Sequence, residues 1–287
     1  MSRRAICVSR DRGLRGAVEP ALAAAGIAVE HCDEVPADTR GAVLVAIDRA
    51  ARLAAGDGLA AIAAPVVIIG DDLDDDGVIA AMLDAPVSHL VADPHDRDLG
   101  ITSAKLASGD LFGLEKYLAA GAAVGERAIA SEADKRSAVG AVSAWAESIG
   151  ARRPVVHRLA GAADELMMNA LYGTPAAGAP RAVLRWGADE RAIAISVGDS
   201  FGALRQRDVI DHVRRARRER GRPLPAADAP RGAGIGFYLV LANVASLVVN
   251  VEAGARTEVV CLFDRTAQGR PAAPCARSLH VFRAAAP

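Results

Sequence analysis

The sequence predicts an α/β protein in two parts, and three observations support this. In the first 93 residues, short β-branched runs alternate with helical patterns. Residues 109–150 then have a mainly helical pattern. After residue 150, a long helical pattern is followed by paired apolar runs around short turns. We therefore expect an N-terminal domain over residues 1–105, a helical connector over 106–126 and a second domain over 127–287.

Five apolar runs predict strands in the N-terminal part: AICVS (5–9), IAVEHC (27–32), AVLVAID (42–48), PVVIIG (65–70) and SHLVAD (88–93). Helical patterns lie between them, over 14–25, 49–63 and 77–83. Continuous β-branched runs separated by helices are typical of a parallel sheet covered on both faces. Five such strands in about ninety residues indicate a flavodoxin-like doubly wound domain.

The second part combines helices with predicted hairpins. Its elements follow in this order: a long helix over 154–172, strands over 181–187 and 191–199, an arginine-rich helix over about 204–220, a helix ending at about 245, strands over 246–253 and 257–263, and an edge-strand pattern over 278–282. Alternating apolar runs joined by short turns predict antiparallel pairs. This part is therefore expected to combine helices with antiparallel strand pairs.

Composition limits the partners and the compartment. The net charge of −1 does not predict a nucleic-acid partner. The four cysteines form no CxxC pair, so they predict neither a zinc site nor a redox motif and fit a reducing cytoplasm. The N-terminal apolar run is too short for a signal peptide. The uncharged stretch 232–251 contains glycines and asparagines, so we expect no membrane segment.

The stretch RGAGIGFYLV (231–240) opens a predicted helix with Gly232, Gly234 and Gly236. A dinucleotide fingerprint requires GxGxxG directly after a strand, and a Walker A loop requires Lys-Ser/Thr after its last glycine. Neither condition is met, because prolines precede the triplet and Phe237 follows it. Backbone N–H groups at a helix start bind anions. A phosphate loop and an ordinary glycine-rich turn remain the alternatives.

The stretch DELMMNA (164–170) places Glu165 and Asn169 four residues apart on a predicted helix, so they share a face. An amide oxygen can coordinate Mg²⁺, and a neighbouring carboxylate can polarise water or accept a proton. A solvated helix face is the alternative.

The stretch ISVGDSFG (195–202) places Asp199 at the end of an apolar strand. A buried carboxylate there could accept a hydrogen bond from an adenine amino group. A simple turn after the strand is the alternative, because Asp and Gly are common in turns.

In order, ELMMNA, GDSFG, a 29-residue segment (203–231) and GAGIG resemble the ATP-binding domain of the gyrase, chaperone, histidine-kinase and MutL (GHKL) superfamily. The resemblance covers residues 127–263. It implies the Bergerat α/β sandwich, a mixed sheet backed by helices on one face. It also implies ATP and Mg²⁺ as cofactors, with the 29-residue segment acting as a lid.

The resemblance also implies roles for single residues. Asn169 would coordinate Mg²⁺, and Glu165 would be the general base or orient water. Asp199 would bind the adenine amino group, with Gly202 in the same turn and Thr257 near the base. Gly232, Gly234 and Gly236 would let the backbone approach the phosphates.

Two departures from the family pattern affect nucleotide binding. The adenine turn usually reads DxGxG, whereas this chain has Phe201 at the expected glycine and Gly202 one residue later. The usual Gly-Thr is Arg256-Thr257. The helix before ELMMNA contains no phosphoacceptor histidine, so the chain is more similar to the stand-alone serine-kinase and anti-sigma-factor branch.

The N-terminal part resembles a response-regulator receiver. The positions that carry receiver chemistry hold Ser9-Arg10, Asp48, Gly70 and Asp93, of which only Asp48 matches. We therefore expect a degenerate receiver that serves as a docking or dimerising module. Within the acidic run 71–77, the residues from Asp72 onwards imitate the start of a calcium loop, but the twelfth position counted from Asp72 is Leu83 rather than Glu. An acidic helix cap is the preferred interpretation.

These observations predict a cytoplasmic signalling protein with a protein partner and the capacity to form a homodimer. If active, its ATP-binding domain would be a serine/threonine-type protein kinase or an anti-sigma-like regulator, with catalysis by positioning and Mg²⁺. The alternative is a non-catalytic switch that controls partner binding, either in response to nucleotide or without any nucleotide. The arginine-rich segment 205–222 is best explained as part of the lid, and we do not expect a nucleic-acid partner.

Overall fold

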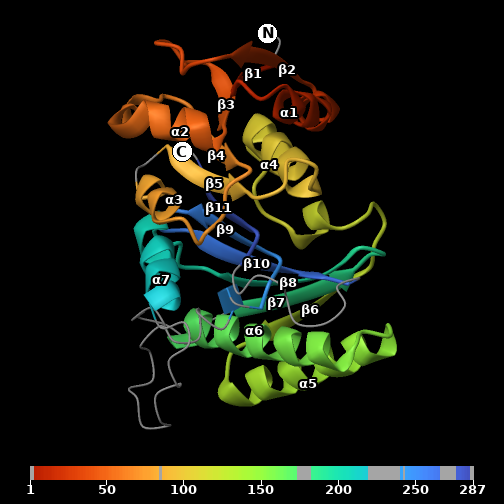
Figure 1. Cartoon of the computed structure of the whole chain (residues 1–287). Coiled ribbons are helices and arrows are strands. Elements are labelled where there is room, and N and C mark those ends of the chain that lie inside the picture. Colours follow the sequence, from red (N-terminus) through yellow and green to blue (C-terminus); the bar gives the residue numbers. More distant parts are fainter. Residues whose placement is uncertain are drawn as a thin grey trace. The chain divides into compact units, whose positions relative to one another are not determined.

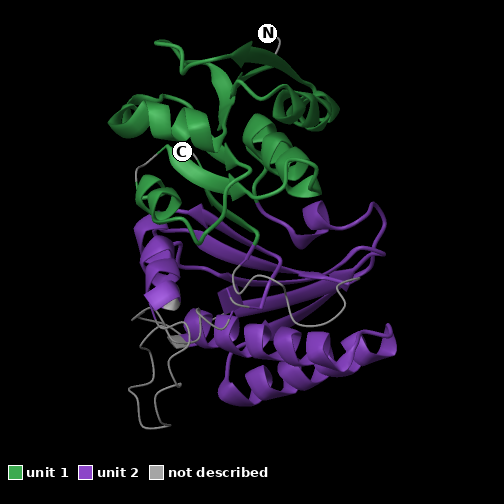
Figure 2. Cartoon of the chain, viewed as in Figure 1, with its two compact units in different colours: residues 1–111, 277–285 green, residues 112–276, 286–287 purple. Residues whose placement is uncertain are grey.

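The computed structural model describes residues 3–83, 86–172, 182–218, 240–241, 243–265 and 276–284. Within these ranges the chain is an α/β protein with seven α-helices and eleven strands. It divides into two compact units: residues 1–111 with 277–285 form unit 1, and residues 112–276 belong to unit 2 (Figure 2). Over the described ranges, no helix combines the length and the apolar character needed to cross a membrane.

Unit 1 alternates strands and helices. Its strands are β1 (Arg3–Val8), β2 (Ile27–Cys32), β3 (Ala42–Ile47), β4 (Val66–Ile69), β5 (Val87–Val91) and β11 (Ser278–Arg283). Its helices are α1 (Arg12–Ala24), α2 (Arg49–Ala55), the 3₁₀ helix η1 (Gly56–Ala61), α3 (Asp76–Ala81) and α4 (Arg97–Ser108). The five strands predicted for this part are confirmed close to their expected bounds.

The sheet of unit 1 has the order β2-β1-β3-β4-β5-β11. The first five strands are parallel, and β11 pairs antiparallel with β5. Helices α1 and α4 cover one face of the sheet, and α2 and α3 cover the other (Figure 1). Because both faces are covered, strands such as β4 are buried at every position.

Two buried histidines lie in the part of unit 1 where α4 meets β5 and β11. His89 and His280 are direct partners across the two strands, and each side chain is about 1% exposed. Thr102 Oγ1 on α4 lies 3.2 Å from His280 Nδ1, and Lys105 Nζ lies 3.9 Å from the centre of the Phe282 ring. His89 Nδ1 and His280 Nε2 have no hydrogen-bond partner among the described atoms. The pKa of His280 is lowered to about 3, mainly by burial and also by Lys105.

The predicted helical connector over 106–126 is wrong beyond Ser108. Helix α4, which the sequence analysis did not identify, begins after Asp96 and ends at Gly109, whose φ is 72°. Gly113 and Gly121 also have positive φ, so the backbone cannot continue as an α-helix through either residue. Only the 3₁₀ helix η2 (Leu114–Tyr117) forms before β6 (Val124–Ile129) pairs with β7.

In its described residues, unit 2 contains an antiparallel sheet and the helices named below. Its strands besides β6 are β7 (Ala182–Ala188), β8 (Ala192–Asp199), β9 (Ser246–Glu252) and β10 (Arg256–Asp264). Its helices are α5 (Glu132–Ser148), α6 (Arg153–Tyr172) and α7 (Gln206–Arg218). The order is β9-β10-β8-β7-β6, and all neighbours within this set are antiparallel.

Helices α5 and α6 lie side by side against one face of the unit 2 sheet, and η2 lies on the other (Figure 1). Residues Leu159, Ala163 and Met167 of α6 are buried at helical spacing. The long helix and the hairpin strands predicted for this part are confirmed. The strand predicted over 278–282 forms as β11, but its assignment as an edge strand of the second part is wrong: β11 is buried over its first five positions and pairs with β5, so it belongs to unit 1.

Candidate functional site

Helix α6 carries Glu165 and Asn169 one turn apart, as their spacing predicted. Leu166 and Ala170, which follow them directly, are buried, so this part of the helix packs inward. Glu165 is half-buried and Asn169 is exposed. The helix therefore offers a carboxylate at the edge of the core and an amide that solvent or a ligand can reach.

Burial raises the pKa of the Glu165 carboxyl, and the neighbouring Asp164 adds to this effect. Lys135 on α5 acts in the opposite direction. The Lys135 ammonium is itself held by Asp164, with Nζ 2.7 Å from Oδ1, and by Glu132 at 3.4 Å. A carboxylate whose pKa is raised towards neutrality is a better proton acceptor than an ordinary glutamate.

Asp199 ends β8 and is fixed by its own turn. The backbone N–H of Phe201 donates to Asp199 Oδ1 at 2.8 Å. Burial raises the pKa of Asp199, whereas hydrogen bonds from Phe201, Gly202 and Thr257 lower it. Thr257 is the direct partner of Asp199 on β10, so the antiparallel register brings the two side chains to the same face of the sheet.

Gly202 packs closely against the turn between β9 and β10. Its φ is 59°, and a Cβ at this position would overlap the carbonyl oxygen of Glu252. The N–H of Gly254 also donates to the Gly202 carbonyl at 3.2 Å. A side chain at this position would therefore be strained and would clash with the backbone, so the turn requires glycine here. The turn uses Gly202 as its glycine and leaves position 201 open to a side chain.

Next to Thr257 on β10 is a second carboxylate of the region, which the sequence did not single out and which lies on the opposite face of the sheet. Glu258 is 6% exposed, and its Oε2 accepts hydrogen bonds from Asn250 Nδ2 at 3.0 Å and from the N–H of Gly113 at 2.9 Å. These bonds attach the segment before η2 to the sheet. A charged residue inside the apolar run TEVVCLF, with Asn in the paired run, was the available signal.

The structure brings together only part of the predicted site. Asp199, Gly202 and Thr257 meet where β8 and β10 pair, and Glu165 and Asn169 share one side of α6. Gly232, Gly234 and Gly236 lie outside the described residues, as do residues 219–231 of the expected lid. The described part of this segment contains α7, which buries Val209, Ile210 and Val213 and exposes charged residues that include Arg207, Asp211 and Arg214.

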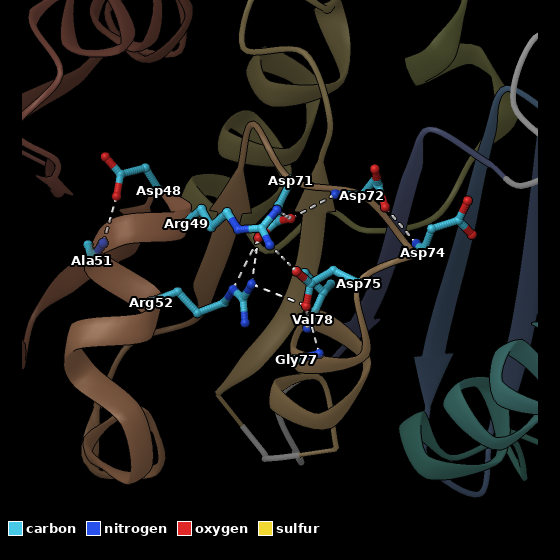
Figure 3. A network of polar contacts seen from close by, with 10 residues as sticks. All are labelled: Asp48, Arg49, Ala51, Arg52, Asp71, Asp72, Asp74, Asp75, Gly77 and Val78. Atoms are coloured by element: carbon cyan, nitrogen blue, oxygen red, sulfur yellow. Dashed lines mark hydrogen bonds and ion pairs between the residues drawn. The ribbon is translucent and has the colours of Figure 1, made fainter.

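The strand ends of unit 1 hold a different set of polar contacts. Asp48 caps α2 by accepting from the N–H of Ala51 at 2.7 Å, and it also accepts from Ser9 Oγ. Asp71, which follows β4, is buried and receives two bonds from Arg52, at 2.7 and 3.2 Å (Figure 3). Asp48 therefore has neutral donors, whereas Asp71 has a cationic one.

The acidic run 71–77 is ordered by arginines and helix caps. Asp75 caps α3 through the N–H groups of Gly77 and Val78 and pairs with Arg49 at 2.8 Å (Figure 3). No cluster of three or more His, Cys, Asp or Glu side chains suited to a metal ion occurs in the described part of the chain. The preferred interpretation of this run as a helix cap is confirmed for Asp75.

No protein-family model matches this sequence, and comparison with curated proteins finds no similar chain. Functional assignment therefore depends on the motifs and on the geometry of the described residues.

Proposed function

We propose that unit 2 binds Mg-ATP as a GHKL-type ATP-binding domain, and that the chain is a signalling protein of the serine-kinase and anti-sigma-like branch. The observation that carries this proposal is the arrangement of Asp199, Gly202 and Thr257 at the paired ends of β8 and β10. It supplies a half-buried acceptor beside a hydroxyl group in a turn that tolerates only glycine at position 202.

Asp199 is suited to recognise an adenine amino group. Its carboxylate can accept about four hydrogen bonds, and its Oδ1 already receives one from Phe201, which fixes its direction. Guanine has a carbonyl group where adenine has its amino group, so the Asp199 carboxylate and the guanine oxygen would be two acceptors facing each other. We therefore expect ATP to bind in preference to GTP, since a site built to pair with a donor rejects the analogue that lacks it.

Asn169 and Glu165 fit the Mg²⁺ and phosphate end of such a site. Mg²⁺ prefers oxygen ligands and usually takes only one or two from protein when phosphates supply others, so the exposed Asn169 amide suffices. When bound, Mg²⁺ would neutralise charge on the phosphates. Glu165 would accept the proton of a partner's Ser or Thr hydroxyl. That oxygen would bond to the γ-phosphorus as the bond to the leaving ADP breaks.

Unit 1 would serve this protein as a degenerate receiver. Its parallel order β2-β1-β3-β4-β5 is that of flavodoxin-like sheets. Both carboxylate oxygens of Asp48 have donors from the protein, and Arg10 replaces the acid that a receiver needs for Mg²⁺. These features support a docking or dimerising role in a cytoplasmic pathway with a protein partner.

Calorimetric titration with Mg-ATP tests the nucleotide site. We expect the wild type to bind and Asp199→Asn to lose at least about tenfold in affinity, because the amide presents a donor to the adenine amino group. Glu190→Gln is the matched control, since Glu190 is exposed in the β7–β8 turn. Absence of binding by the wild type, or equal binding by Asp199→Asn, contradicts the proposed site.

The second candidate function is a non-catalytic switch, which is favoured by Phe201 at the position where the family has glycine. Glu165→Gln separates it from the kinase. Loss of phosphotransfer with retained ATP binding supports catalysis, and Glu147→Gln on the exposed side of α5 is the control. Binding without any phosphotransfer by the wild type supports the switch.

A further inference from the structure

We propose that unit 1 binds a small molecule that carries an ammonium or amidinium group on a compact apolar body. The starting observation is a cavity of about 590 Å³ between the β2–β3 connection and the α2–η1 segment. This volume lies within the range of small-molecule sites. The proposed binding is independent of ATP and concerns unit 1, in which only Asp48 matches the receiver positions.

The cavity lies where the topology of the sheet favours ligands. Arg10, just after β1, and Asp48, just after β3, both line it. From β1 the chain crosses to β2 on one side, and from β3 it continues to β4 on the other. In doubly wound sheets, ligands bind outside the carboxyl ends of the strands at this reversal of strand order. Unit 1 therefore combines a cavity with the position that such sheets use for binding.

Asp48 supplies the charge that selects the ligand. Its carboxylate accepts from the Ala51 N–H and from Ser9 Oγ, both uncharged donors, and it has no cationic partner within the described ranges. Arg49 and Arg52, on the helix that Asp48 caps, pair with Asp71 and Asp75 instead. Figure 3 shows the Asp48 carboxylate turned away from this network. A half-buried carboxylate without a counter-ion is stabilised when a cation binds beside it.

The other charged residues that line the cavity already have partners. Arg10 pairs with Glu34 at 2.9 Å, and Asp33 receives a 2.6 Å contact from Arg15. The side chains of Arg10 and Glu34 are 72% and 79% exposed, so their charges lie in water and are screened. Asp48 therefore determines the charge that the cavity prefers, which is positive.

The remaining lining accounts for the apolar body. Val35, Pro36 and Ile62 line the cavity together with alanines that include Ala54 and Ala55. Alanine side chains leave the volume open and contribute apolar surface without hydrogen-bonding groups. A compact apolar group would gain from leaving water here, while an anion would face the Asp48 carboxylate.

Ligand-observed NMR with the full chain tests the charge preference. The probe is 2-phenylethylamine, and the matched anion is 3-phenylpropanoate, which has the same aromatic body. We expect the amine to bind with a dissociation constant of about 1 mM, as for a good fragment, and the carboxylate not to bind. Equal binding of the two probes, or no binding of the amine, overturns the proposal.

Three variants locate the binding. Asp48→Asn keeps an oxygen that can cap α2 and is expected to weaken amine binding at least about tenfold. Ala54→Phe fills the cavity without changing charge and is expected to abolish binding. Ala60→Phe, on an exposed position of η1 outside the lining, is the control and should bind as wild type. Circular dichroism confirms the fold of each variant. Unchanged binding by folded Ala54→Phe also refutes the assignment.

Discussion

Acid should destabilise unit 1 through its buried histidines, and His280→Asn should remove part of that effect. The pKa of His280 is lowered from 6.5 to about 3 by burial and by Lys105. The pKa of His89 is lowered in the same direction, by burial, His280 and Lys105. As the pH falls below about 6.5, the unfolded chain takes up protons that the folded chain does not. Stability is therefore lost from about pH 6.5 downwards, until the folded-state pKa is reached.

The magnitude follows from the two pKa values. At about pH 5, a histidine that titrates at 6.5 when unfolded and at about 3 when folded costs about 2 kcal/mol of unfolding free energy. His89 adds a cost of the same sign. Asparagine at position 280 has no charge to gain. The loss of stability between about pH 7.5 and pH 5 should thus be smaller in His280→Asn by about 2 kcal/mol.

The assay is urea unfolding at both pH values, followed by hydrogen exchange of the β5 amides, which report on unit 1. His95→Asn is the matched control, because this exposed imidazole is in water in the folded and the unfolded chain. A pH dependence of His280→Asn equal to that of the wild type would refute the reasoning, whatever its stability at neutral pH. A change of the same size in His95→Asn would also refute it.

Three further predictions concern stability. Gly202→Ala should lower the free energy of unfolding by roughly 1–3 kcal/mol or more, because position 202 has a positive φ and a methyl group there would meet the Glu252 carbonyl oxygen. The control is Gly140→Ala in α5, where a methyl group meets open space; it should raise the melting temperature measured by circular dichroism. Arg52→Met should cost up to roughly 3–5 kcal/mol, because the buried Asp71 would keep only the 3.8 Å contact from the exposed Arg49, and adding Asp71→Leu should recover much of this in a double-mutant cycle; additive effects would contradict a direct interaction. Glu258→Ala should speed hydrogen exchange at Gly113, whose N–H it binds, whereas exchange as slow as in the wild type would show that other contacts hold this segment.

The strands of unit 1 could be predicted from sequence because burial on both faces requires an unbroken apolar run. β4, VVII, is the clearest case. The structure of the connector could not be predicted, because the positive φ angles of Gly109, Gly113 and Gly121 interrupt a sequence pattern that otherwise favours a helix. β6 has few buried residues and forms by pairing with β7, a non-local contact that local pattern does not encode.

Parts of the candidate site could also be predicted. The spacing of Glu165 and Asn169 fixes their relation on any helix, and the two hairpins bring Asp199 opposite Thr257. The role of Gly202 as the turn glycine required the position of the β9–β10 turn, which contacts it from about fifty residues away in the chain. The Glu258–Asn250 pair likewise depends on the register between two strands.

The placement of β11 determines the order in which this protein can be completed. Thr102 and its partner His280 are 178 residues apart, and β11 is the strand that covers the outer edge of β5 in unit 1. A ribosome that has released residues 1–111 has therefore released an unfinished sheet, and all of unit 2 must emerge before the last strand does. A fragment that ends at residue 111 would lack β11 permanently, so β5 would have no partner on that side. To express unit 1 alone, residues 277–285 should be spliced back through a short linker so that β5 regains its neighbour.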